Sequence, residues 1–249
     1  MSARSLALLP PFLLFCLLAL QCTHQSQRIG TRSAAAEART SFPSDFERRV
    51  KRHGFVNIRE YAPSIPVDLH YATSNNVAGQ PIYPRNMPCL LRQKTADKLL
   101  RAQRELQAQG LGLKIWDAWR PARSHLALWD AAPKSGYVVP PSAGFSRHCL
   151  GVAVDVTLVD SRGRELPMPT RFDDFTPAAA SKYSGNDEQI RNRVAALQRA
   201  MRNAGFSGIN SEWWHFSDLS TPADVVFANE LGIQLPNNVR KVKFTYGRS

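Results

Sequence analysis

The chain has 249 residues and a formal net charge of +12 at pH 7. Its length suits one domain of ordinary size behind an amino-terminal tail. The positive charge would suit an anionic cell envelope, or simply solubility. The basic residues carry no nucleic-acid-binding motif and are not interleaved with an aromatic platform, so the sequence predicts no nucleic-acid partner.

The chain begins with a segment that is typical of exported proteins. We expect residues 1–22 to be a secretory signal peptide, because Arg4 supplies positive charge and residues 6–20 are apolar apart from Pro10 and Pro11. The apolar run is short for a membrane span, and an uncleaved anchor is the alternative. The sequence therefore predicts export to the periplasm or association with the cell envelope.

The next segment, residues 23–52, is polar and rich in serine, alanine and arginine. A segment with so few large apolar residues cannot bury enough surface to fold by itself. We expect it to be a flexible basic linker, which leaves residues 53–249 as a single domain.

The remaining chain alternates between helical and extended patterns. Residues 94–109 place apolar side chains on one helical face and are followed by Gly110, which predicts an amphipathic helix. A second long helix should begin after Asn186 or Asp187 and end at Gly205. Strands are expected at residues 63–72, 112–119, 152–159 and 213–216, a short helix at residues 122–132, and a loop rich in proline, glycine and serine at residues 134–145.

Two stretches far apart in sequence carry three residues of metal-ligand type, His148, Asp155 and His215. A lone histidine in an apolar run is usually packed and hydrogen-bonded. Asp155 stands between Val154 and Val156, however, and an unpaired buried charge is costly. Three such ligands with an open fourth position are typical of a catalytic zinc site, so we expect these residues to hold one zinc ion.

Glu212 precedes His215 by three residues and is the candidate general base. A carboxylate beside a zinc-bound water can take its proton. The aromatic stretch that holds both residues predicts a strand, and side chains at odd separation on an extended chain face opposite ways. Glu212 and His215 can therefore share a pocket only if a bend or bulge lies between them.

Residues 146–158 read Ser-x-His-x-x-Gly-x-Ala-x-Asp-x-Thr-Leu, and with the distal Glu-Trp-Trp-His they resemble the VanX-type D-alanyl-D-alanine dipeptidases. Residues 67–73, 117–121 and 172–173 resemble further elements of this family, with Trp119 in place of a tyrosine. The resemblance covers roughly residues 55 to 220. It implies the α+β fold shared with D,D-carboxypeptidases and the hedgehog amino-terminal domain, in which a small antiparallel sheet is flanked by helices.

The resemblance also implies a role for each site residue. Arg120 would stabilise the oxyanion, Tyr71 and Asp173 would hold the substrate ammonium, and Ser146 would help to hold the far end of the substrate. Glu212 would relay a proton to the leaving amine. The implied reaction is zinc-dependent hydrolysis of D-alanyl-D-alanine to two D-alanines, in cell-wall metabolism or glycopeptide resistance.

Two other functions stay open from the sequence. One is a D,D-carboxypeptidase or other peptidoglycan peptidase on the same fold, and the other is a non-catalytic wall-binding module that kept its zinc. The matches at Tyr71 and Asp173 favour the dipeptidase, because a free ammonium needs a carboxylate partner. Glu212 and Arg120 argue against a pure binding module, which would need neither.

The cysteines allow one disulfide in an oxidising compartment. Cys89 and Cys149 are the pair outside the amino-terminal segment that could bridge. Cys149 is also a weak ligand candidate because it follows His148. We expect its side chain to point away from that of His148, as neighbours on a strand do.

Overall fold

The centre of the fold is a four-stranded antiparallel sheet in the order β3-β4-β6-β5. The computed structural model describes residues 44–133, 136–241 and 243. Within this part of the chain, β1 and β2 form a second, two-stranded antiparallel sheet. The strands are β1 (Phe55–Asn57), β2 (Leu90–Arg92), β3 (Leu111–Asp117), β4 (Ala153–Asp160), β5 (Ser207–Ile209) and β6 (Glu212–Ser217).

Helices and short 3-10 turns connect these strands. The predicted α+β fold, with a small antiparallel sheet flanked by helices, is confirmed. Among the described residues, no helix has both the length and the apolar character that crossing a bilayer requires. The α-helices are α1 (Ser44–Arg52), α2 (Ile58–Tyr61), α3 (Gln93–Gln107), α4 (Ala122–Ala131), α5 (Glu188–Asn203) and α6 (Asn237–Arg240), and the 3-10 helices are η2 (His70–Ala72), η3 (Pro141–Ala143), η4 (Arg147–Leu150) and η5 (Pro177–Ala179).

The two long helices form where the sequence predicts them. α3 buries Ala96, Leu99 and Leu106, whose spacing of three or seven residues puts them on one helical face. α5 begins after Asp187, whose side chain accepts a hydrogen bond from the backbone N–H of Ile190. This N-cap satisfies one of the backbone donors that a helix leaves free at its start.

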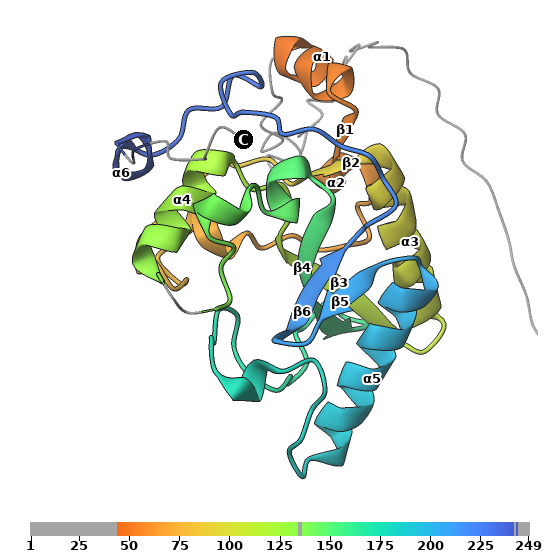
Figure 1. Cartoon of the computed structure of the whole chain (residues 1–249). Helices are drawn as coiled ribbons and strands as arrows, with labels where there is room; N and C mark the ends of the chain where they lie inside the picture. Colours follow the sequence, from red (N-terminus) through yellow and green to blue (C-terminus); the bar gives the residue numbers. More distant parts are fainter. Residues whose placement is uncertain (1–43, 134–135, 242, 244–249) are drawn as a thin grey trace, which may run out of the picture. The chain divides into compact units, whose positions relative to one another are not determined.

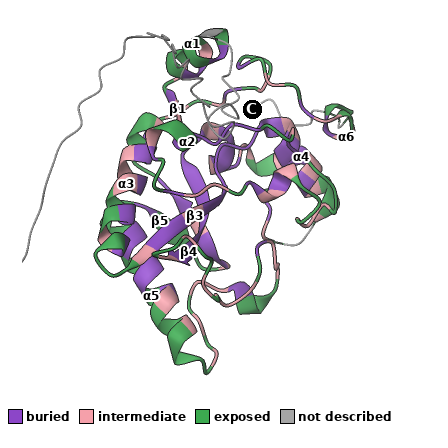
Figure 2. Ribbon diagram, turned by 180° about the vertical axis from the view of Figure 1, so that it is seen from behind, coloured by how far each residue is buried: buried purple, intermediate pink, exposed green. Residues whose placement is uncertain are grey.

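The long helices pack against each other and against the central sheet. Figure 1 shows α3 and α5 to the right of the sheet and α4 to its left. Figure 2 shows that β3 and β4 are buried, whereas α3 and α5 have an exposed outer side. β4 therefore lies in the middle of the core, and Asp155 within it is removed from water.

The strand register places the polar residues of the sheet in one row. Asp155 on β4 pairs with His215 on β6 and with Asp117 on β3. Directly paired residues of antiparallel strands project their side chains to the same face. Asp117, Asp155 and His215 thus project side by side from three neighbouring strands.

The bulge that the sequence requires in β6 is present. Along β5, Gly208 pairs with Phe216 and the next residue, Ile209, pairs with Glu212. The segment of β6 between these two partners is therefore longer than the segment of β5 that it faces. The irregularity breaks the strict alternation of side chains, so that Glu212 and His215 can face the same side.

The predicted linker is wrong at its carboxyl end. Residues 44–52 form α1, and its Phe46 and Val50 are buried in the hydrophobic core. These apolar residues lie four apart and share one face of a short helix whose other residues are polar or charged. The folded domain thus includes α1 rather than starting at residue 53. Residues 1–43, with the predicted signal peptide and most of the linker, lie outside the described residues.

The predicted strand at residues 63–72 is also wrong. Residues 63–72 contain an isolated bridge from Val67 to Ile115 and the 3-10 helix η2 rather than a strand. Pro63 and Pro66 fall in this segment, and proline cannot donate a hydrogen bond to a strand partner. His148 lies in η4, before β4 begins. The expectation for Cys149 based on strand geometry therefore does not apply.

The candidate disulfide between Cys89 and Cys149 is not formed. Both residues are buried thiols in this structure. The domain is therefore held together by its core and hydrogen bonds without a bridge between these two positions.

Gly151 closes the turn that carries His148. Its φ of 73° lies in the left-handed region that favours glycine, and its N–H donates to the carbonyls of Arg147 and His148. A Cβ at this position would lie 2.2 Å from Cε1 of Phe55. Both the backbone conformation and the close approach of an aromatic ring therefore require glycine here.

We expect Gly151→Ala to lower the free energy of unfolding by about 3 kcal/mol, from about 1 kcal/mol of left-handed strain and about 2 kcal/mol of overpacking. Urea denaturation measures this loss. Gly163→Ala is the matched control, because Gly163 has a φ of 77° but a Cβ there would have no atom within 4 Å. Its free energy of unfolding should fall only by the cost of the left-handed backbone, about 1 kcal/mol. Equal losses in the two variants would show that contact with Phe55 does not constrain the turn.

Candidate active site

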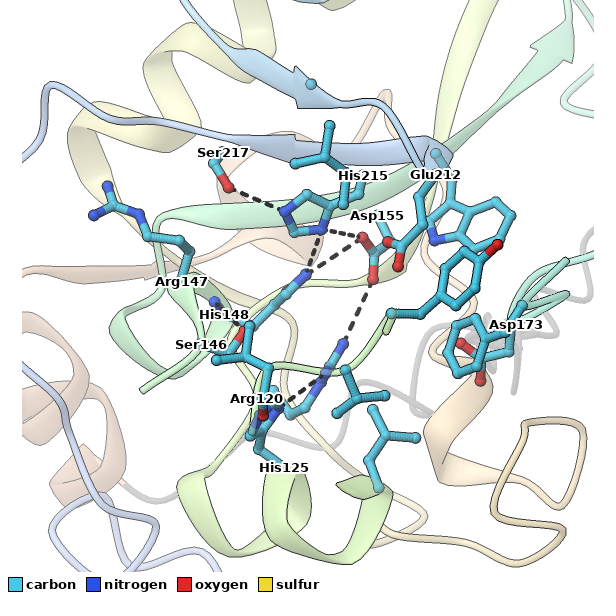
Figure 3. Close-up of a pocket in the computed structure, with 18 of the residues that line it drawn as sticks. Arg120, His125, Ser146, Arg147, His148, Asp155, Asp173, Glu212, His215 and Ser217 are labelled. Atoms are coloured by element: carbon cyan, nitrogen blue, oxygen red, sulfur yellow. Dashed lines mark hydrogen bonds and ion pairs between the residues drawn. The ribbon is translucent and has the colours of Figure 1, made fainter. Parts of the chain in front are cut away.

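A cavity of about 310 Å³ opens on the face of the sheet where the polar row projects. Its walls come from β4, β5, β6, η2, η4, α4 and several loops. Figure 3 shows the labelled side chains converging on it from both sides. Every residue that the sequence assigns to the site lines this cavity, namely Tyr71, Arg120, Ser146, His148, Asp155, Asp173, Glu212 and His215.

The three candidate ligands meet in a compact triangle. Nε2 of His148 lies 3.1 Å from Nδ1 of His215 and 3.3 Å from Oδ1 of Asp155. Nδ1 of His215 lies 2.9 Å from the same carboxylate oxygen. Burial would raise the pKa of Asp155, but the neighbouring His148 and His215 hold it below its usual range.

The hydrogen bonds on the far side of each ring orient the two histidines. Nδ1 of His148 donates to the carbonyl of Ala118 at 2.7 Å, since a carbonyl can only accept. A neutral His148 then presents the lone pair of Nε2 to the triangle. Nε2 of His215 lies 3.0 Å from Oγ of Ser217, which leaves Nδ1 of His215 facing the other two ligands. Metal-binding histidines are commonly oriented in this way.

The geometry of the triangle fits a tetrahedral metal site. Ligand atoms bound at about 2.0–2.1 Å in a tetrahedron lie about 3.3 Å from one another. The three separations of 2.9, 3.1 and 3.3 Å are close to that value. Among the described residues, His148, Asp155 and His215 form the group of histidine, cysteine and acidic side chains that is arranged to hold a metal ion, and Cys149 is not part of it.

Glu212 lies at the edge of the triangle and is only 6% exposed. Figure 3 shows its carboxyl group beside Asp155, on the cavity side of β6. Burial raises the pKa of Glu212 to about 7, although the nearby His215 lowers it. A carboxyl group with a pKa near neutral is well suited to take and return a proton.

Arg120 is a buried cation between two carboxylates. Its Nε and Nη2 donate to Oδ2 of Asp117 at 2.9 and 2.7 Å. Nη2 also lies 3.6 Å from Oδ2 of Asp155, and the guanidinium carbon lies 4.8 Å from the centre of the Tyr71 ring. The guanidinium is therefore fixed beside the candidate metal ligands with its charge retained, as expected for arginine.

Asp173 is tied into the opposite wall of the cavity. Its Oδ1 accepts from the hydroxyl of Tyr71 at 2.9 Å and its Oδ2 accepts from the backbone N–H of Val77 at 3.1 Å. Its φ of 59° lies in the left-handed region, which is unusual for aspartate and occurs where the surroundings determine the backbone. Burial raises the pKa of Asp173 to about 6, although Val77 and Tyr71 oppose this. Asp173 lines the cavity, whereas the adjacent Asp174 does not.

Ser146 stands at the start of η4 and is buried. Its Oγ accepts from the backbone N–H of His148 at 3.4 Å, which makes it the N-cap of the turn. The hydroxyl hydrogen remains available to donate into the cavity.

Sequence reasoning missed three residues of the site. Asp117 fixes Arg120, Tyr83 donates to Oδ1 of Asp117 at 2.6 Å, and His125 contacts Arg120 on its other side. Asp117 lies three residues before Arg120 in the same motif, and this short separation could have indicated that the two side chains pair. Tyr83 and His125 approach from other segments and gave no signal of their own.

The comparisons with known proteins agree with this geometry. The sequence model of a family described as D-ala-D-ala dipeptidase matches residues 51–231. The chain is 34% identical to the D-alanyl-D-alanine dipeptidase of Escherichia coli K12 over 161 residues, which cover 65% of this chain and 82% of that protein. It is 31% identical to the D-alanyl-D-alanine dipeptidase of Enterococcus faecium over 189 residues, which cover 66% of this chain and 90% of that protein.

We expect His215→Ala and Asp155→Asn each to lose most of the bound metal, because each removes one of three ligands. Glu212→Gln should keep about one metal ion per chain and lose turnover by about 100-fold or more, since it removes only a proton carrier. Metal analysis of the purified variants measures the content. His70→Ala is the control, because His70 lies in η2 and does not line the cavity. Full metal content in His148→Ala would refute the assignment of the ligands.

Proposed function

The chain belongs to the D-ala-D-ala dipeptidase family, and on this basis we propose that it hydrolyses D-alanyl-D-alanine to two D-alanines with one zinc ion. The triangle formed by His148, Asp155 and His215 supports the proposal most directly. Two imidazole nitrogens and one carboxylate oxygen are a common ligand set for zinc in hydrolytic enzymes. Zinc bound there would polarise the scissile carbonyl and lower the pKa of the attacking water.

Glu212 carries the proton in this mechanism. Its carboxylate takes a proton as water adds to the carbonyl carbon, and it returns that proton to the nitrogen of the leaving D-alanine as the C–N bond breaks. Burial, which raises the pKa of the Glu212 carboxyl, helps the same group to act as base and then as acid.

Arg120 stabilises the negative charge that develops on the carbonyl oxygen. Its guanidinium is held by Asp117 before the substrate arrives, so little reorganisation is needed in the reaction. Such fixed donors in a site removed from water contribute several kcal/mol to transition-state stabilisation, typically about 3 kcal/mol for one donor.

The two ends of the dipeptide are recognised on opposite sides of the cavity. Asp173, held by Tyr71, receives the substrate ammonium, and Ser146 donates to the carboxylate. The ammonium lies close to the scissile bond in a dipeptide and would be buried in this small cavity. A buried ammonium without a partner costs several kcal/mol, so Asp173 selects substrates with a free amine.

We expect D-alanyl-D-alanine to be cleaved far faster than its N-acetyl form, by about 10⁴-fold, because acetylation removes the charge that Asp173 pairs with. Asp173→Asn should lose activity on the dipeptide and keep its metal. Asp174→Asn is the matched control, since Asp174 is the adjacent carboxylate and does not line the cavity. Release of free D-alanine measures the rates. Equal cleavage of free and acetylated dipeptides would replace this function with that of a D,D-carboxypeptidase.

We also propose that the protein is exported to the periplasm or cell envelope, where it serves cell-wall turnover or glycopeptide resistance. The charged start and short apolar run of residues 1–22 support export. Fractionation of cells that express the full chain should find it outside the cytosol with a shortened amino terminus. Recovery of the intact chain from the cytosol would contradict export and would leave the proposed reaction unaffected.

A further inference from the structure

His125 lies on α4, directly behind Arg120, and is 1% exposed. Its Nδ1 lies 3.3 Å from Nη1 of Arg120, and its Nε2 lies 2.8 Å from the carbonyl oxygen of Val139. Figure 3 shows the His125 ring below the Arg120 side chain, at the base of the cavity. One buried ring therefore contacts both the guanidinium and the loop that follows α4.

The two contacts determine the tautomer of the His125 ring. The carbonyl of Val139 can only accept, so Nε2 carries the hydrogen and donates it. An arginine N–H can only donate, so Nδ1 must be unprotonated and accept it. Burial lowers the pKa of His125 to about 3, and the charge of Arg120 adds to this effect. The ring is thus neutral at physiological pH and serves as donor and acceptor at once.

The contact with His125 completes the fixation of Arg120. Asp117 accepts from Nε and Nη2, which leaves the second terminal nitrogen to be oriented from elsewhere. Nη1, on the side of the guanidinium away from Asp117, contacts Nδ1 of His125. Each terminal nitrogen of arginine carries two hydrogens, so Nη1 keeps one that can point into the cavity.

The contact with Val139 anchors one wall of the same cavity. Tyr137, Val138 and Val139 line it, and Val138 is buried. The ring of Tyr137 stacks on that of Phe175, with centres 5.0 Å apart and planes at 9°. This wall segment, residues 137–139, is thus attached to His125 at one end and to the loop of Asp173 at the other.

We propose that His125 is a positioning residue with two separable tasks. Its Nδ1 orients the Arg120 guanidinium toward the reacting carbonyl, and its Nε2–H fixes the wall segment against which the dipeptide binds. The first task acts on the transition state and the second on substrate binding. This inference rests on the proposed dipeptidase reaction.

Two conservative substitutions separate the tasks. The side-chain amide of asparagine reaches the place of Nδ1, whereas that of glutamine reaches the place of Nε2. His125→Asn should therefore keep the acceptor for Arg120 and lose the donor to Val139, which raises KM and leaves kcat near that of the wild type. His125→Gln should lower kcat by about 10-fold to 100-fold with a smaller change in KM, and His125→Phe should show both defects.

Ser124→Ala is the matched control. Ser124 is the adjacent buried residue on α4, and its hydroxyl donates to the carbonyl of Ile82 at 2.8 Å. The variant loses one buried hydrogen bond without touching Arg120 or the wall segment. It should keep kcat and KM, and all variants should keep their metal content. Wild-type kinetics in His125→Phe would overturn the proposal, as would equal changes in kcat and KM for the asparagine and glutamine variants.

A measurement on the wild-type protein separates this inference from the proposed reaction. Nitrogen-15 NMR of labelled histidine at pH 7 should find His125 neutral, with its proton on Nε2. A proton on Nδ1 would overturn the positioning role whatever the activity. Failure of the wild-type protein to cleave D-alanyl-D-alanine would refute the proposed function instead, and the tautomer would then decide whether His125 anchors Arg120 and Val139.

Discussion

The structure depends on one row of buried charge across the sheet. The register of three strands sets Asp117, Asp155 and His215 side by side, and both carboxylates are withdrawn from water. Two carboxylates so close together repel each other and are poorly solvated. Cations that lie against them offset this repulsion. The elements around the row supply that compensation.

Arg120 provides one positive charge for the two carboxylates and contacts both of them. One negative charge then remains in a region where an unpaired ion costs several kcal/mol. The imidazoles of His148 and His215 direct nitrogen atoms at the same carboxylate oxygen. A divalent cation at this point would offset that charge and bind all three candidate ligands. The buried charge and the arrangement of the three side chains therefore both favour a metal ion at this position.

The sequence could predict those parts of the site where a residue does not fit the regular pattern of its strand. Asp155 is a charge within an apolar strand, and Glu212 and His215 stand at a spacing that requires a bulge, which β6 contains. The buried contact of His125 with Arg120 could not be predicted, because a separation of five residues indicates no particular interaction. The second partner of His125, the carbonyl of Val139, lies on a loop whose path the sequence does not reveal. The sequence did not predict helix α1, because its charged residues outnumber its two buried apolar residues, Phe46 and Val50. Local composition thus predicts which residues line the cavity and predicts long-range packing poorly.

X-ray absorption at the zinc edge tests the central claim most directly, because it reports the atoms around the metal. The proposed site predicts one zinc per chain, with two imidazole nitrogens and carboxylate oxygen at about 2.0–2.1 Å and no sulfur. Cys149 follows His148 directly in the chain, so a misassigned site would most readily include its thiol. A sulfur neighbour at about 2.3 Å, or a zinc with a single imidazole, would contradict the site described for this protein.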